Sequence, residues 1–299
     1  MDFAPAALSR ARTAPPAAAG REPWAPPELS LVCLDIDDTL IDCTAAIRRT
    51  LHALTGRDDL WPLWDLITEE HVALVVAGKL GYDVMHHRRT ECFLAELGIS
   101  ADSAQVSAFE ARRLEILARS WRLFDDVLPC LEWLRAAGLH LAAVTNASGV
   151  HQRRKIAELG LAPFFDHVAI AGEVGVAKPD PVMFHSVCLA LECPPERTVH
   201  VGDKLDTDAI GAFDAGLGAV WLDRDGTSRT GERAPDGVHT VSGLDELPEL
   251  LVSEYATVGV PAPRAAGTPL RRSAAGCSSI SSRAALTWAT GKVPHWGMV

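Results

Sequence analysis

The sequence contains no Cys-x-x-Cys pair and no regularly spaced set of cysteines. Its seven cysteines are scattered along the chain, at positions 33, 43, 92, 130, 188, 193 and 277. An odd and unpatterned set is typical of reduced thiols in a cytosol and argues against a disulfide framework. We therefore expect a cytoplasmic protein.

Long apolar runs are also missing. No stretch is long and apolar enough to cross a membrane, so no membrane partner is expected. The segment before Pro27 is rich in Ala and Pro, and it lacks the apolar stretch of a secretory signal. Residues 1–28 are therefore predicted to form a disordered leader.

A surplus of basic residues is absent as well, since the formal net charge is −11. This charge argues against a nucleic-acid partner, because phosphate backbones select basic surfaces. It leaves small anionic substrates open, because one local patch of positive charge is enough for them. From Tyr255 onward the chain has five basic residues, no acidic one and much Ala, Ser, Gly and Pro. Residues 255–299 are therefore predicted to form a disordered basic tail.

Short apolar runs are present and recur along the chain. They lie at residues 31–34, 139–144, 168–171, 198–201 and 219–222. Runs of this length are typical of strands that are buried on both faces. Helical patterns lie between them, for example at 127–137 and 152–159, each followed by a glycine. This alternation predicts an α/β fold with a doubly wound, Rossmann-like parallel sheet.

Residues 46–124 interrupt the alternation, because they contain no comparable strand. Their periodicity predicts amphipathic helices around 44–54, 65–77, 82–97 and 103–120. We interpret 46–124 as an inserted helical cap domain. The α/β core is then expected at 29–45 and 125–254, with linkers near 41–45 and 124–127.

Polar residues follow the predicted strands where they end. The residues are Asp35, Asp37, Asp38 and Thr39 after the first strand, Thr145 and Asn146 after the second, Lys178 after the third, and Asp203 and Asp208 after the fourth. Open α/β sheets bind ligands at the carboxyl ends of their strands, so we expect these residues to converge. Each signal alone is weak, since strand-end acids and threonines also cap helices. The crowding of acids around one lysine is the stronger signal, because it favours a bound cation.

This combination of residue types suits phosphoryl transfer. A carboxylate such as Asp35 can attack phosphorus, and Asp37, two residues later, can exchange protons with the leaving group and water. Mg²⁺ prefers one or two carboxylates, which Asp35 and Asp203 can supply. Thr145 and Lys178, with the backbone N–H of Asn146, can then bind the phosphoryl oxygens.

The four motifs resemble those of the haloacid dehalogenase superfamily over roughly residues 29–250, in their order and their strand-end placement. The resemblance is to its phosphatase-like subgroup with a helical cap after the first strand. It implies Asp35 as the nucleophile, and Asp37 as the general acid/base whose backbone carbonyl also binds the metal. Asp203 would be the metal-binding acid.

The resemblance also assigns the remaining motif residues. Thr145 matches the phosphate-binding hydroxyl, and Lys178 matches the lysine that holds both the nucleophile and the phosphate. Asp208 matches a supporting acid of the last motif. Thr39 and Asp38 complete the first motif, and Asp38 receives no chemical role.

The expected function is Mg²⁺-dependent hydrolysis of a small phosphorylated metabolite through an aspartyl-phosphate on Asp35. A phosphomutase of the same superfamily shares all four motifs and stays open. A dehalogenase needs no acid at position 37, which argues against it, and a non-catalytic binding module need not retain every reactive residue. The basic stretch 86–89 could contact an anionic substrate, although a solvated helix face is the favoured interpretation. The sequence indicates no particular ester or oligomeric state.

Overall fold

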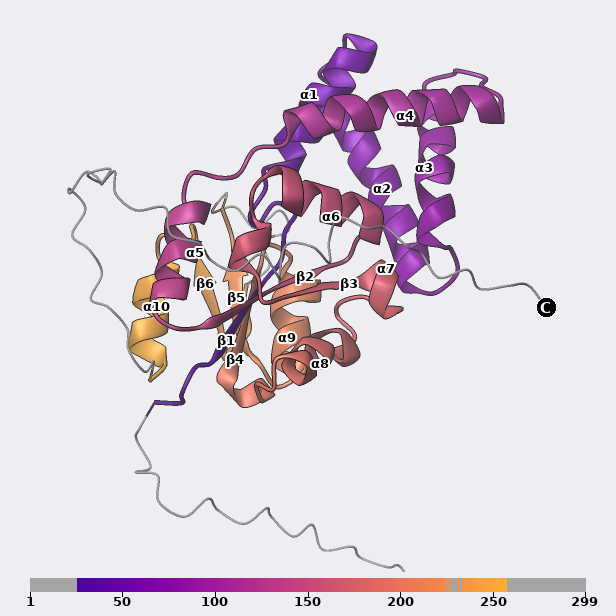
Figure 1. The fold of residues 1–299 in the computed structure, drawn as a ribbon. Helices are drawn as coiled ribbons and strands as arrows, with labels where there is room; N and C mark the ends of the chain where they lie inside the picture. Colours follow the sequence, from indigo (N-terminus) through magenta and orange to yellow (C-terminus); the bar gives the residue numbers. More distant parts are fainter. Residues whose placement is uncertain (1–25, 225, 227–230, 232, 257–299) are drawn as a thin grey trace, which may run out of the picture. The chain divides into compact units, whose positions relative to one another are not determined.

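One parallel sheet organises the core. The computed structural model describes residues 26–224, 226, 231 and 233–256. Within this range, six strands pair in the order β3-β2-β1-β4-β5-β6 (Figure 1). They are β1 (Leu31–Leu34), β2 (His140–Thr145), β3 (His167–Ile170), β4 (Thr198–Gly202), β5 (Gly218–Leu222) and β6 (Val238–Val241). The strand order changes direction between β1 and β4, which is where doubly wound sheets bind their ligands.

The composition of β1 explains its central place. All four of its residues are fully buried. Because successive strand residues point to opposite faces, Val32 and Leu34 join one apolar cluster while Leu31 and Cys33 join another. A strand that is apolar on both faces is stable only with helices on each side of the sheet.

Helices cover both faces of the sheet (Figure 1). The cluster around Val32 includes residues of α5 (Val127–Ala136), α6 (Gly149–Glu158) and α10 (Leu247–Glu254). Residues of α8 (Pro181–Ala190) and α9 (Gly211–Asp214) pack on the opposite face. Short turns complete the core: α7 (Ala171–Val174), 3₁₀ helices at Ala162–Phe164 and Pro195–Arg197, and a π-helix at Leu205–Ile210. The predicted doubly wound fold is confirmed.

Four helices follow β1, as the periodicity of residues 46–124 predicts. They are α1 (Cys43–Thr55), α2 (Trp61–Val76), α3 (Tyr82–Glu96) and α4 (Ser103–Ser120). Apolar residues of the segment form a cluster of their own, with Trp64 and Phe93 in edge-to-face contact at 5.0 Å. Asp102 is the N-cap of α4 and forms a capping box with Gln105. The Asp102 side chain accepts a hydrogen bond from the Gln105 backbone N–H, and the Gln105 side chain accepts one from the Asp102 backbone N–H.

The two segments that join these helices to the core pair with each other. Asp42 N donates to Arg122 O over 3.0 Å, and Phe124 N donates to Leu40 O over 3.2 Å. Both lie within or beside the linkers predicted near 41–45 and 124–127. The two connecting segments between the core and the helices α1–α4 are therefore hydrogen-bonded to each other.

The structure adds one strand that the sequence analysis missed. In β6, Val238 and Val241 are buried, His239 is half-buried and Thr240 is exposed. An edge strand of this kind has no continuous apolar run, whereas each of the other five strands has one. At the ends of the described chain, Leu29 N donates to Ala256 O and Ala256 N to Pro27 O. The remainder of the predicted leader and tail lies outside the described residues.

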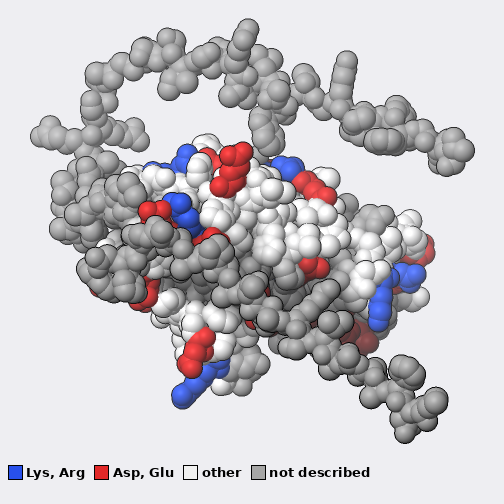
Figure 2. Space-filling model, turned by 90° about the horizontal axis from the view of Figure 1, so that it is seen from below, with Lys and Arg blue, Asp and Glu red and all other residues white. Residues whose placement is uncertain are grey.

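None of the described helices is both long and apolar enough to cross a bilayer. On the face of the molecule seen in Figure 2, acidic and basic side chains are interspersed over the described surface. That part of the surface shows no broad patch of one sign.

Candidate active site

Asp35 follows β1 directly and lies at the centre of the site. Its backbone N–H donates to Val201 O of the neighbouring strand over 2.9 Å, which fixes the residue at the carboxyl edge of the sheet. Its side-chain Oδ1 accepts from Lys178 Nζ over 2.6 Å. Burial raises the pKa of Asp35 to about 7; Lys178 opposes this shift, while Asp208 and Asp37 add to it.

Lys178 reaches this edge from the loop before α8. Its ammonium donates to Asp35, to Asp208 Oδ1 over 2.6 Å and to Val144 O over 2.7 Å. Burial alone would lower the pKa of Lys178, but Asp208 and Asp35 outweigh it and raise that pKa above its ordinary value. Lys178 is therefore a fixed positive charge beside the candidate nucleophile.

Asn146 holds the backbone of Lys178. Its Nδ2 donates to Lys178 O over 2.8 Å, and its Oδ1 accepts from Lys178 N over 2.7 Å. Both ends of the amide are used in this clamp. Only the backbone of Asn146 is then available to bind the substrate directly, which is the role predicted from the sequence.

Asp203 and Asp208 follow β4 and differ in their surroundings. Asp208 lies in the π-helical turn, where Oδ1 accepts from Lys178 and contacts His200 Nε2 at 3.1 Å, and Oδ2 accepts from Lys204 N. Burial would raise the pKa of Asp208, yet Lys178 and His200 hold it below its ordinary value. Asp203 has the opposite shift: burial, Asp35 and Asp208 raise its pKa well above the usual range.

These carboxylates fit a divalent cation. Oxygen atoms of Asp35, Asp203 and Asp208 lie within 4.8 Å of one another. Both oxygens of Asp208 already accept protein hydrogen bonds, so Asp35 and Asp203 are the better direct ligands. An oxygen-only set with two carboxylates suits Mg²⁺. Thr39 Oγ1 lies 3.4 Å from Asp203 Oδ1, and so its hydroxyl supports this acid.

Thr145 ends β2 and is 2% exposed. Its Oγ1 accepts from Gln152 Nε2 over 2.8 Å. The predicted phosphate-binding hydroxyl therefore lies at the same edge of the sheet as Asp35 and Lys178.

Asp37 is near Asp35, but its carboxylate contacts three other side chains. It accepts from Gln152 over 2.7 Å, from Cys43 Sγ over 2.8 Å and from Lys155 Nζ. Burial would raise the pKa of Asp37, but the Lys155 charge and these hydrogen bonds outweigh it and lower that pKa. Gln152 and Lys155 were missed as site residues, because a helix register alone does not show what a side chain contacts.

Asp38, which received no chemical role, has a structural one. It adopts a left-handed backbone with φ of 60°. Its side chain accepts from the backbone N–H and from the hydroxyl of Thr44, each over 2.8 Å. Asp38 thus fixes the start of α1, next to the first motif.

The basic stretch 86–89 divides into different environments. Arg88 is exposed and pairs with Glu91 on its own helix. Arg89 is buried and pairs with Glu110, which corrects the expectation of a solvated face for this residue. His86 stacks edge-to-face on His151 of α6 at 5.1 Å, and burial together with Arg89 lowers the pKa of His86 to about 3. His86 is therefore a neutral contact between α3 and the core.

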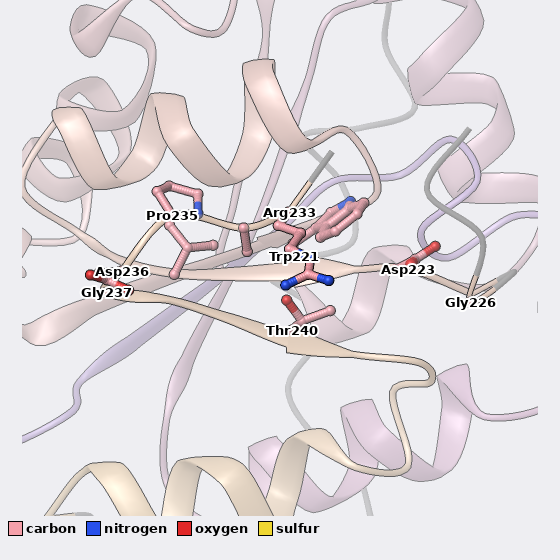
Figure 3. Close-up of a pocket in the computed structure, with 10 residues that line it drawn as sticks. Trp221, Asp223, Gly226, Arg233, Pro235, Asp236, Gly237 and Thr240 are labelled. Atoms are coloured by element: carbon pink, nitrogen blue, oxygen red, sulfur yellow. The ribbon is translucent and has the colours of Figure 1, made fainter. Parts of the chain in front are cut away.

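A separate hollow of about 560 Å³ lies along β5 and β6 (Figure 3). Trp221, Arg233 and Thr240 are among its lining residues, and none of the predicted site residues lines it. Trp221 Nε1 donates to Asp203 O over 2.9 Å, so this indole lies between the hollow and the acidic cluster. The cluster itself is a distinct site.

Comparisons with known proteins identify a family and several relatives. A family model for haloacid dehalogenase-like hydrolases matches residues 29–216. A glyceraldehyde 3-phosphate phosphatase of Methanopyrus kandleri is 32% identical over 66% of this chain and 84% of its own. An N-acylneuraminate-9-phosphatase of Mus musculus is 31% identical over 74% and 93%. The structure of L-2-haloacid dehalogenase from Xanthobacter autotrophicus has a TM-score of 0.62 at 22% identity, covering 76% of this chain and all of that one.

The chain belongs to the haloacid dehalogenase-like hydrolases. The family model covers more than half of the sequence, and it spans all four motifs. This confirms the predicted superfamily and the prediction of a hydrolase. The two relatives named above are similar over most of their length and are phosphatases, whereas the dehalogenase shows a shared fold only.

Proposed function

We propose that this protein hydrolyses the phosphate monoester of a small metabolite, using Mg²⁺ and an aspartyl-phosphate on Asp35. The observation that carries the proposal is the setting of Asp35. Its carboxylate is buried at the end of the central strand, bound by Lys178 and adjacent to Asp203. The named phosphatase relatives support the same reaction class.

The reaction has two balanced steps. In the first, an Asp35 oxygen bonds to phosphorus while the bond to the leaving alcohol breaks. Asp37 takes part in its protonated form, although Lys155 favours the ionised form, and gives its proton to that alcohol. In the second, Asp37 takes a proton from water, the water oxygen bonds to phosphorus, and the bond to Asp35 breaks. Inorganic phosphate leaves and both carboxyl groups return to their starting states.

Fixed charges and hydrogen-bond donors stabilise the phosphoryl group throughout. Lys178 supplies a permanent positive charge, and Thr145 and the backbone of Asn146 supply donors. Mg²⁺, held by Asp35 and Asp203 with the carbonyl of Asp37, would neutralise charge on the phosphoryl oxygens. Asp208 acts indirectly, by holding Lys178.

We further propose that helices α1–α4 form a cap that excludes water and selects the substrate. The contacts that link them to the core include the His86–His151 ring pair and the Lys204–Glu69 ion pair of 2.7 Å. The free thiols of the described cysteines, at positions 33, 43, 92, 130, 188 and 193, support action in the cytoplasm.

A panel of phosphorylated metabolites tests the proposal. Purified protein should release inorganic phosphate from at least one of them with Mg²⁺ and stop when EDTA is added. Asp35→Asn should lower kcat at least about 10³-fold, because the nucleophile is lost. Asp214→Asn is the matched control. Asp214 lies on α9, away from the predicted site residues, so this variant should retain wild-type activity.

Three results would count against the proposal. Absence of phosphate release across the panel would overturn the reaction class. Activity retained by Asp35→Asn would overturn the mechanism. Transfer of phosphate within a sugar phosphate without release would favour the phosphomutase.

A further inference from the structure

Two side chains of α6 hold the Asp37 carboxylate and have no part in the proposed chemistry. Gln152 donates to Asp37 Oδ2 over 2.7 Å, and Lys155 donates to Oδ1. They are three residues apart on one helix, so they share a face. Gln152 is 1% exposed and Lys155 is 8% exposed. A long polar side chain is costly to bury, so this placement depends on the bonds that each residue makes.

Gln152 also connects Asp37 to Thr145. Its amide nitrogen carries two hydrogens, and it donates to Asp37 Oδ2 and to Thr145 Oγ1. Since the Thr145 oxygen accepts this bond, its own O–H is directed away from Gln152. That hydrogen is then available to a phosphoryl oxygen. One amide thus orients both the acid/base carboxylate and the phosphate-binding hydroxyl.

We propose that Lys155 and Gln152 are positioning residues for proton transfer. Lys155 fixes the direction in which Asp37 faces the leaving group, and Gln152 fixes Asp37 and the Thr145 hydroxyl together. The inference rests on the proposed phosphatase function. It assigns a role in the reaction to the helix after β2, besides the residues at the strand ends.

A series of substituted phenyl phosphates tests the role of Lys155. The ratio kcat/KM reports the steps up to release of the phenol, and a poor leaving group needs a proton that p-nitrophenol does not. Lys155→Met should lower kcat/KM about 10²-fold for phenyl phosphate and about tenfold or less for p-nitrophenyl phosphate. A misfolded fraction of the protein would lower kcat/KM by the same factor for every ester. A loss that differs between the two esters therefore does not arise from misfolding.

Three further variants extend the test. Arg154→Met alters the neighbouring exposed position of α6, where Arg154 pairs with Glu158, and should leave the series unchanged. In an Asp37→Asn background, Lys155→Met should cause little additional loss, because both changes remove the same proton transfer. Gln152→Met should also weaken inhibition by inorganic phosphate several-fold, through the Thr145 hydroxyl.

Equal losses across the series would overturn the positioning role of Lys155. The same conclusion would follow if Lys155→Met lowered kcat/KM as much in the Asp37→Asn background as in the wild type. Unchanged phosphate inhibition in Gln152→Met would overturn the link to Thr145. A wild-type protein inactive on every ester would instead overturn the proposed function on which this inference rests.

Discussion

The Asp35 side chain shows how charge and function are coupled at the residue scale. Burial raises its pKa to about 7, and the nearby Asp208 and Asp37 reinforce this shift against Lys178. A nucleophile must be ionised, so the carboxylate needs more positive charge than Lys178 alone supplies. The crowded acids therefore favour Mg²⁺ binding for an electrostatic reason.

Asp35→Asn should stabilise the metal-free protein at high pH. The folded pKa, about 7, lies above the ordinary value of 3.8, so the folded protein binds this proton more tightly than the unfolded chain does. Stability from this group is present at low pH and is lost as pH rises toward 7. The gain from Asp35→Asn should thus reach roughly 2–4 kcal/mol at pH 8 and be less than half as large at pH 5.

Urea unfolding in EDTA at both pH values measures this gain. Added Mg²⁺ should then stabilise the wild-type protein more than Asp35→Asn, because the variant lacks one carboxylate ligand. If Asp35→Asn raised the free energy of unfolding by the same amount at pH 5 and pH 8, the raised pKa of Asp35 would be contradicted.

At the scale of elements, an ion-paired cluster joins α3 and α4. Glu110 accepts from Arg113 over 2.7 and 2.6 Å, from Thr90 over 2.8 Å and from Arg89 over 3.3 Å. Both guanidinium groups lie over the Trp64 ring of α2, at 4.4 and 5.0 Å from its centre. The cluster therefore connects three of the four helices.

Glu110→Gln should destabilise the protein by about 3 kcal/mol at pH 7, because two buried guanidinium groups lose the carboxylate with which both of them pair. Burial would raise the pKa of Glu110, but Arg113 and Arg89 lower it to about 2. The stabilisation is hence present above the ordinary value of 4.5 and disappears as pH falls toward 2. Denaturant unfolding at pH 7 and pH 3 should show that Glu110→Gln lowers the free energy of unfolding less at pH 3 than at pH 7.

Glu115→Gln is the control on the same helix. Glu115 is exposed and pairs with Arg112 and Arg119, so its replacement should change stability little at either pH. Equal effects of Glu110→Gln and Glu115→Gln would contradict the structural role of the buried cluster.

For the whole molecule, the sequence predicts the sheet and the meeting of the four motifs. Continuous apolar runs identify buried strands, and parallel strands bring their carboxyl ends to one edge, so Asp35, Thr145 and Lys178 could be expected together. The half-exposed strand β6 lacks such a run and was missed.

Contacts that depend on side-chain direction were not predictable in this way. Gln152 and Lys155 occur in an ordinary amphipathic helix, and nothing in their spacing shows that they meet Asp37. The burial of Arg89 likewise depends on Glu110 of another helix. Such contacts are set by how helices pack, and a local pattern does not contain that information.

The most direct test of the central claim is mass spectrometry of the enzyme quenched in acid during its first turnover. With Mg²⁺ and a substrate, one phosphoryl group should appear on the peptide that contains Asp35. It should be absent in EDTA and in Asp35→Asn. A phosphoryl group on another residue, or Asp35→Asn hydrolysing the ester at the wild-type rate, would contradict the claim.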